Sequence, residues 1–123
     1  MDISTEIDKK NKIIIIKAAC LLDQNIRKNI LFTIALHIKD LGYHKVLVDL
    51  TESSFKKDEP MAGALELTSF MASIGIPQHA KIAFVFTEAE EHRMYFEGVA
   101  QTSGFNIRYF RHPDQARDWL STP

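Results

Sequence analysis

Apolar and polar positions are grouped along this chain in a pattern that predicts strands and helices in alternation. Short blocks rich in branched apolar residues predict five strands, at residues 3–8, 12–18, 46–50, 81–86 and 105–110. Apolar residues spaced three or four positions apart predict four helices, which run from Asp23 to about Leu41, over Met61–Ile74, from Thr87 to Gly104, and onward from Pro113. The first two strands are candidates for a hairpin. The pattern therefore predicts an α/β fold with a mostly parallel, mixed sheet of about five strands and four helices.

The predicted strand Val46–Leu50 is the centre of this arrangement. Both of its faces are apolar, as in a parallel strand that is covered on two sides. Its one acid, Asp49, lies near the carboxyl end, where open α/β sheets place their ligand crevices. A polar crossing over residues 51–57 follows. Asp58 or Glu59 is then well placed to cap the next helix, with a proline in its first turn.

The helix predicted over Met61–Ile74 carries a single charge, Glu66. At about 100° per residue, its apolar side chains cover more than half of its circumference, so it needs cover on more than one side. One small sheet covers one side only; neighbouring helices, a homodimer seam or a groove for an apolar ligand can cover the rest. The candidate interface or apolar-ligand surface comprises Met61, Leu65, Leu67, Phe70, Met71 and Ile74, together with Phe32 and Leu36 of the preceding helix.

The predicted topology gathers one set of polar side chains, at the carboxyl ends of the strands. Carboxylates and hydroxyls at such a place could hold a metal ion or act in acid–base catalysis. Acids and hydroxyls at helix starts are also the expected helix caps, and we favour that interpretation. The candidate polar crevice comprises Asp49, Thr51, Ser53, Ser54, Asp58 and Thr87.

Composition narrows the possible classes of function. The chain has 123 residues, and we expect residues 1–123 to form one domain with its own core. A net charge of −1 creates no field that attracts nucleic acid, so we expect no nucleic-acid partner. The polar start lacks a signal-peptide pattern, and the apolar runs are too short to span a membrane. We therefore expect a cytoplasmic protein without an integral membrane segment.

No motif for chemistry is present in the sequence. The five glycines form no phosphate-binding loop, and Cys20 is the single cysteine, so it has no partner for a disulfide or a metal cluster. The five histidines fall in different predicted elements and lack metal-ligand spacing. We expect no cofactor, no metal and no enzymatic activity.

The stretch from Arg93 to Leu120, RMYFEGVAQTSGFNIRYFRHPDQARDWL, resembles the SpoIIAA-like family, which is related to STAS domains. The pattern VLVDLTESSF and the order of elements extend the resemblance over nearly the full chain. It implies a small α/β domain of successive strand–helix turns. Related STAS domains act as anti-sigma-factor antagonists or regulatory modules, and the fold class is often compared with CRAL-TRIO lipid-transfer domains. The matching positions are Arg93, Met94, Gly104, Phe105, Phe110, Ala116, Trp119 and Leu120.

The chain departs from this resemblance at the serine that can be phosphorylated in anti-sigma antagonists. There, a pattern similar to Asp-Ser-Ser-Gly stands where the loop after the central strand enters its helix. Here the corresponding stretch is Lys57-Asp58-Glu59-Pro60, and Ser53 and Ser54 lie several residues upstream. We do not expect a phosphorylation switch at this position.

Three hypotheses for the function follow from these observations. The first is a non-catalytic STAS-like regulatory module that acts through protein–protein contact, either as a homodimer or with another protein. The alternative is the binding or sensing of an apolar, lipid-like small molecule next to the Met61–Ile74 helix. The third is a minor hydrolase-like activity at the crevice near Asp49 and Thr87.

Overall fold

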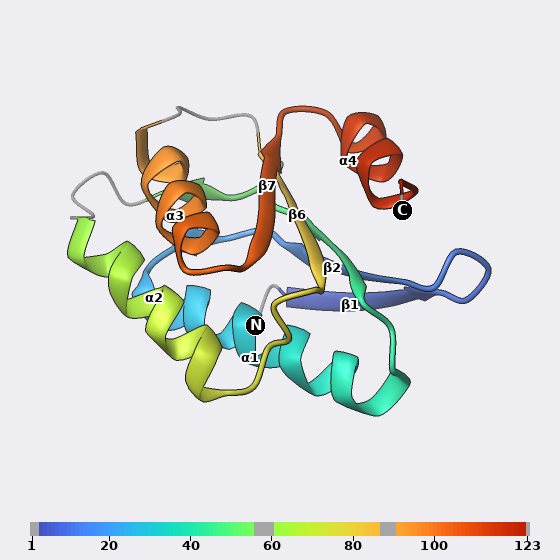
Figure 1. Ribbon diagram of the computed structural model, residues 1–123. Helices are drawn as coiled ribbons and strands as arrows, with labels where there is room; N and C mark the ends of the chain where they lie inside the picture. The colour runs from blue at the N-terminus through green and yellow to red at the C-terminus, as the bar shows by residue number, and fades with distance from the viewer. Residues whose placement is uncertain (1–2, 56–60, 87–90, 123) are drawn as a thin grey trace.

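The protein is built on a five-stranded mixed sheet with helices on both faces (Figure 1). The computed structural model describes residues 3–55, 61–86 and 91–122. The strands are β1 (Ile3–Asp8), β2 (Ile13–Ala18), β3 (Leu21–Leu22), β4 (Lys45–Asp49), β5 (Ser54–Phe55), β6 (Lys81–Val85) and β7 (Asn106–Phe110), and the helices are α1 (Gln24–Leu41), α2 (Met61–Ser73), α3 (Glu91–Thr102) and α4 (Pro113–Leu120). The main sheet has the order β1-β2-β4-β6-β7, in which β1 is antiparallel to β2 and the other neighbours are parallel. The predicted fold class is confirmed.

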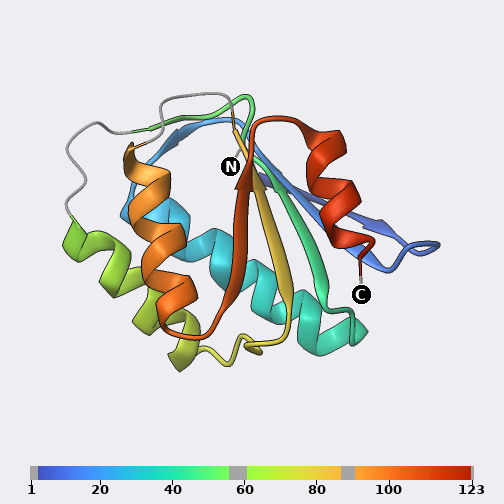
Figure 2. The same ribbon diagram turned by 45° about the horizontal axis from the view of Figure 1, so that its top comes forward.

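The helices cover the two faces of the sheet unequally (Figure 2). On one face, α1, α2 and α3 enclose the larger core, where Ile34, Met71 and Ile82 are fully or almost fully buried. On the other face, α4 packs Ala116 and Leu120 against the sheet. The strands β4 and β6 are consequently buried on both sides, as their continuous apolar runs predict.

Helix α1 begins and ends at the residues that the sequence predicts. A carboxylate oxygen of Asp23 accepts a hydrogen bond from the backbone N–H of Ile26 (2.8 Å), which caps the first turn. After the last turn, Gly42 takes a left-handed φ of 71° and donates its N–H to the carbonyl of Ile38 (2.8 Å). Glycine has no Cβ to oppose this conformation, which is common at helix C-termini.

The two edges of the main sheet are β1 and β7. The predicted hairpin is confirmed: β1 and β2 pair with Asp8 opposite Ile13, and the Asp8 carboxylate accepts two hydrogen bonds from Asn11 in the turn (3.1 and 2.9 Å). The hydrogen bond from the Asn11 side chain lowers the pKa of Asp8 most, and the bond from the Asn11 backbone lowers it further. At the other edge, β7 exposes Asn106 and Arg108 and buries Ile107 between them.

A second, two-stranded sheet joins the segment after β2 to the segment after β4. Leu21 lies opposite Ser54, and Leu22 lies opposite Phe55, in a parallel pair of strands β3 and β5. The sequence predicts only a polar crossing at residues 51–57. Strands of two residues are too short to have a readable period, so the hydrophobic pattern cannot reveal them.

The C-terminal helix α4 begins at Pro113, as predicted, and a lysine from the sheet holds its end. The Lys81 Nζ of β6 donates to the Trp119 carbonyl (3.2 Å) and to the Thr122 hydroxyl (2.8 Å), and it lies 5.3 Å from the centre of the Trp119 ring. A positive charge at a helix C-terminus also opposes the negative end of the helix dipole. Lys81 therefore fastens α4 to the sheet.

Candidate functional site

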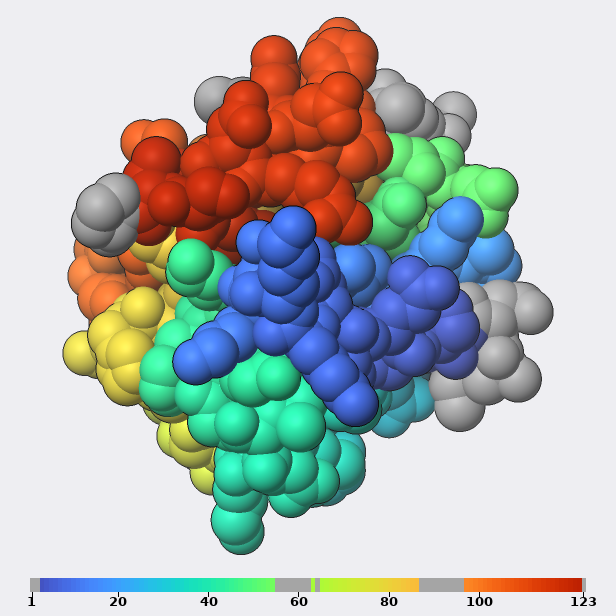
Figure 3. Space-filling model, turned by 90° about the vertical axis from the view of Figure 1, so that its right-hand side faces the viewer, coloured from blue at the N-terminus to red at the C-terminus, as the bar shows by residue number. Residues whose placement is uncertain are grey.

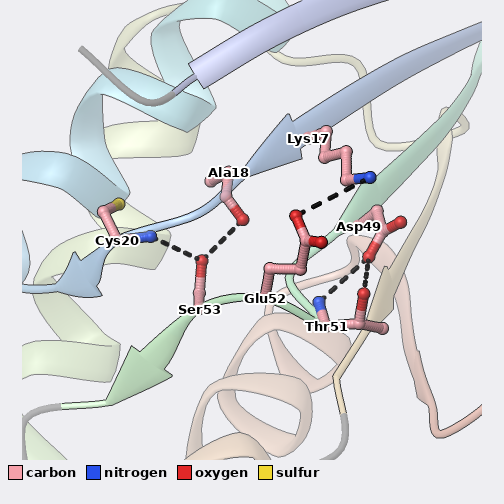
Figure 4. A network of polar contacts seen from close by, with 7 residues as sticks. All are labelled: Lys17, Ala18, Cys20, Asp49, Thr51, Glu52 and Ser53. Carbon is pink, nitrogen blue, oxygen red and sulfur yellow. Dashed lines mark hydrogen bonds and ion pairs between the residues drawn. The ribbon is translucent and has the colours of Figure 1, made fainter.

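The first part of the predicted polar crevice lies where β4 leaves the sheet (Figure 4). Asp49 Oδ1 accepts hydrogen bonds from the backbone N–H of Thr51 (2.9 Å) and from the Thr51 hydroxyl (2.7 Å). Such bonds from an aspartate to the residue two positions on form a local turn. One carboxylate oxygen of Asp49 and the hydroxyl of Thr51 therefore shape the backbone at this point.

The second part, Ser53, joins two segments of the chain that are far apart in sequence. Its buried hydroxyl donates to the carbonyl of Ala18 (2.7 Å) and accepts from the backbone N–H of Cys20 (3.3 Å). Figure 4 shows the side chain between these two backbone groups. The carbonyl of Cys20 in turn accepts the N–H of Ser54 (3.0 Å). Because its hydroxyl is buried and bonded on both sides, Ser53 ties the end of β2 to the loop after β4.

The structure describes one of the three remaining crevice residues. Ser54 is exposed in β5, whereas Asp58 and Thr87 lie outside the described residues. The Lys17–Glu52 ion pair beside them spans 3.8 Å between exposed side chains, and such pairs contribute little to stability. Within the described ranges, no group of three or more His, Cys, Asp or Glu side chains could hold a metal ion. The described part of the crevice therefore connects strands and turns.

The apolar helix α2 obtains its cover from neighbouring helices, one of the alternatives that the sequence leaves open. It packs against α1 on one side and α3 on the other. Leu67 and Met71 are buried in the larger core, so these two candidate residues are core residues and are not part of an accessible surface. The apolar-ligand groove predicted beside this helix stays a prediction, with two of its expected lining side chains already packed against the protein.

Three of the candidate surface residues are accessible from outside. Phe32 and Leu36 of α1 are 48% and 45% exposed, and Leu65 of α2 is 54% exposed. Phe70 and Ile74 are half-buried and pack against the larger core. The side chain of Met61 lies outside the description. We use the term α1–α2 surface for the outer faces of these two helices with Phe32, Leu36 and Leu65.

Polar contacts that the sequence does not predict hold α1 and α2 together. Gln24 donates to the backbone carbonyl of Gly63 (2.9 Å), and the Lys28 ammonium binds the carboxylate of Glu66 while lying 5.7 Å from the centre of the Phe70 ring. The contact with Lys28 is the main reason that the pKa of Glu66 is lowered. The sequence indicates this contact between α1 and α2 only in that Glu66 is the single charged residue of the predicted helix Met61–Ile74.

Comparisons with solved structures identify the fold. The chain is similar to the anti-sigma factor antagonist SpoIIAA in its unphosphorylated form, with a TM-score of 0.56, 12% identity, and coverage of 98% of this chain and 99% of that one. It is similar to a putative anti-sigma factor antagonist from Thermotoga maritima, with a TM-score of 0.56, 13% identity, and coverage of 98% and 95%. It is also similar to an uncharacterized protein of the DUF3478 family with a SpoIIAA-like fold from Shewanella loihica PV-4, with a TM-score of 0.53, 18% identity, and coverage of 96% and 91%.

The chain therefore has the SpoIIAA-like fold, and the resemblance noted in its sequence is confirmed at that level. No family model matches the sequence, and no curated protein gives a significant match to it. In the described ranges, no helix combines the length and the apolar character needed to cross a membrane.

Proposed function

We propose that this protein is a non-catalytic regulatory module that acts by binding another protein through the α1–α2 surface. The observation that carries the proposal is the accessibility of Phe32, Leu36 and Leu65, three large apolar side chains that are each about half exposed on two adjacent helices. Single exposed apolar residues are ordinary, but several on two helices that pack together offer a place where a partner can exclude water.

Phe32 and Leu36 form the centre of this contact surface. They are four residues apart on α1, so their side chains lie one above the other on the same face of the helix. A partner that presents an apolar helix face or groove would fit such a pair, because both side chains can enter one apolar contact. Burying the exposed half of each side chain would contribute about 1 kcal/mol.

The comparisons and the polar crevice give the proposal further support. SpoIIAA and the Thermotoga maritima protein are described as anti-sigma factor antagonists, a name for proteins that act on another protein. At the carboxyl ends of the strands, the hydroxyls of Thr51 and Ser53 are engaged in backbone contacts. A role in binding uses the fold without requiring free reactive groups at that end.

An affinity-capture experiment with matched variants tests this proposal. Tagged wild-type protein and the double variant Phe32→Ser/Leu36→Ser are used to capture proteins from a lysate of the source cells, and the captured proteins are quantified by mass spectrometry. The control is Leu21→Ser, because Leu21 is 55% exposed but lies in β3. We expect the double variant to capture about tenfold less of a specific partner, or even less, since 1.4 kcal/mol corresponds to a tenfold change in affinity. The control should capture as much of that partner as the wild type. Equal capture by both variants would contradict the proposal.

A second copy of the protein is a further possible partner for the α1–α2 surface. A Leu65→Glu variant tests this possibility, because Leu65 is the most accessible apolar residue among the described candidates of α2. If copies associate there, sedimentation of the wild type gives the mass of two chains and the variant gives that of one. A mass of two chains for both would place self-association away from Leu65, and a mass of one chain for the wild type would contradict self-association.

A further inference from the structure

Two side chains of α3 cover the backbone at the β7 edge of the sheet. The Glu97 carboxylate accepts the backbone N–H of Tyr109 (2.7 Å), and the Gln101 amide donates to the carbonyl of Ile107 (2.9 Å). A sheet edge with free N–H and C=O groups is a template for another strand, and proteins commonly block such edges. The β7 edge is blocked in this way by Glu97 and Gln101.

Two cross-strand bonds fix the direction in which the backbone groups of the other strands point. Lys81 donates its N–H to the carbonyl of His44 (2.8 Å), and Leu50 donates its N–H to the carbonyl of Val85 (2.7 Å). Odd-numbered residues of β6 therefore direct their backbone groups at β4, and even-numbered residues of β4 direct theirs at β6. Because the direction alternates along a strand, the odd-numbered residues of β4 point at β2.

The same alternation identifies the outward-pointing backbone groups of β1. In a parallel pair, a residue bonds to both neighbours of the residue opposite it, and Leu47 lies opposite Ile15. Even-numbered residues of β2 thus point at β4, and Ile15 points at β1, where it lies opposite Glu6. Thr5 and Ile7 consequently direct their N–H and C=O groups away from the sheet. The same alternation predicts that the odd-numbered residues of β7 point outward, which agrees with the bonds that Ile107 and Tyr109 form with side chains of α3.

In the part of the chain that the structure describes, the β1 edge has no cover comparable to that of β7. No side chain within residues 3–55, 61–86 and 91–122 forms a hydrogen bond with an outward backbone group of Ile3, Thr5 or Ile7. The hairpin of β1 and β2 extends beyond the body of the protein in Figure 1 and lies at the surface of the face shown in Figure 3. An extended strand with open backbone groups is therefore accessible to another strand.

We propose that β1 is a docking edge for a second copy of this chain, whose own β1 adds in antiparallel orientation to form a continuous sheet. Thr5 would lie opposite Thr5 of the second copy, with each N–H donating to the carbonyl of the other. Ile3 would lie opposite Ile7 of the second copy, which joins apolar side chains that already pack against the core. This inference does not rest on the α1–α2 surface.

Backbone direction and the pairing of Ile3 with Ile7 favour this register. Residues with outward groups must face each other, so the strands can shift only in steps that keep odd-numbered residues opposite odd-numbered ones. In the proposed register Glu6 lies opposite Ser4 of the second copy. The next register places Glu6 opposite Glu6, which is destabilising. A shift in the opposite direction places Ile3 opposite Thr5 and leaves Ile7 without a described partner residue.

The variant Thr5→Pro, compared with Thr5→Val, tests the proposal by sedimentation over a range of concentrations. Proline removes the N–H that would bond across copies, and that N–H bonds to nothing in β2, so the hairpin keeps its ladder. Valine preserves the N–H and the shape of the side chain. Wild type and Thr5→Val are expected to shift from the mass of one chain to that of two as concentration rises, whereas Thr5→Pro stays at one. A wild type that remains a single chain at the highest concentration overturns the proposal.

Amide hydrogen exchange of the wild type gives a second test that does not depend on any variant. The N–H groups of Thr5 and Ile7 are open in a single chain and bonded in the paired form. Their exchange is expected to slow about tenfold when nine-tenths of the chains are paired, because exchange then proceeds from the remaining tenth. The Tyr109 N–H, which Glu97 already binds, should not respond. Slowing of Thr5 and Ile7 only on addition of an extended peptide, and not with protein concentration, would exclude the second copy as occupant.

Discussion

Replacing Ser53 with alanine removes a buried side chain that connects the end of β2 to the loop after β4. The hydroxyl donates to Ala18 at 2.7 Å and accepts from Cys20 at 3.3 Å. Ala18 is fully buried, so its carbonyl is left without that partner and without water in its place. An unsatisfied buried polar group costs about 1–3 kcal/mol, and the longer bond to Cys20 adds little. We expect Ser53→Ala to lower the free energy of unfolding by about 2 kcal/mol.

Chemical denaturation and thermal melting measure this loss directly. For a chain of this size, 2 kcal/mol corresponds to a fall in Tm of roughly 6–10 °C. The control is Ser54→Ala, which removes an exposed hydroxyl at the adjacent position and should change stability by less than about 0.5 kcal/mol. Equal effects of the two variants would refute the assignment of Ser53 as the structural connection, and would leave its hydroxyl available for another role.

Three further substitutions test other contacts of the structure. Lys81→Met removes the ammonium from the end of α4, and we expect a loss of about 1 kcal/mol in denaturation together with a changed fluorescence of the single tryptophan. Glu66→Gln should remove part of the pH dependence of stability, because Lys28 lowers the pKa of the Glu66 carboxyl in the folded protein. The stability that Glu66 contributes is present above the ordinary pKa range of a glutamate and is lost as the pH falls through its folded-state pKa. In acid denaturation, the difference in stability between wild type and variant should therefore shrink as the pH falls through that range. Gly104→Ala should lower the free energy of unfolding by about 1–2 kcal/mol, because φ is +95° and the added Cβ would lie 3.0 Å from Gln78. The control is Gly98→Ala within α3, where the added Cβ meets no neighbour within 4 Å. In the same melting assay, this control should be neutral or stabilising by up to about 1 kcal/mol.

The elements that follow from hydrophobic period and capping chemistry could be predicted from the sequence. The limits of α1 depend on Asp23 and Gly42, whose local preferences agree with the tertiary structure. Strand β4 is predicted at residues 46–50 and observed at Lys45–Asp49, a difference of one position that is normal at element ends. The capping residues predicted before α2 and α3, which include Asp58 and Thr87, lie outside the described residues.

What the sequence could not reveal is how neighbouring elements share the surface of α2. A helix that is apolar nearly all round indicates that it needs cover, but the same pattern arises whether the cover is a helix, a second copy or a ligand. The structure places α1 and α3 beside it, and so Leu67 and Met71 are core residues while Leu65 remains exposed. The contact between Lys28 and Glu66 joins residues 38 positions apart, beyond the reach of local patterns.

The contacts around the start of α2 have a consequence for binding at the α1–α2 surface. The β3–β5 pair and the Ser53 bridge fasten the segment after β4 to the segment that leads into α1. Gln24 and Lys28 then bind α2 directly at Gly63 and Glu66. The two helices are thus fixed relative to each other before a partner arrives, which reduces the entropy lost on association. The polar residues at this end of the sheet would therefore contribute to function by holding the apolar surface in place, so that Ser53→Ala should weaken partner binding without touching the partner.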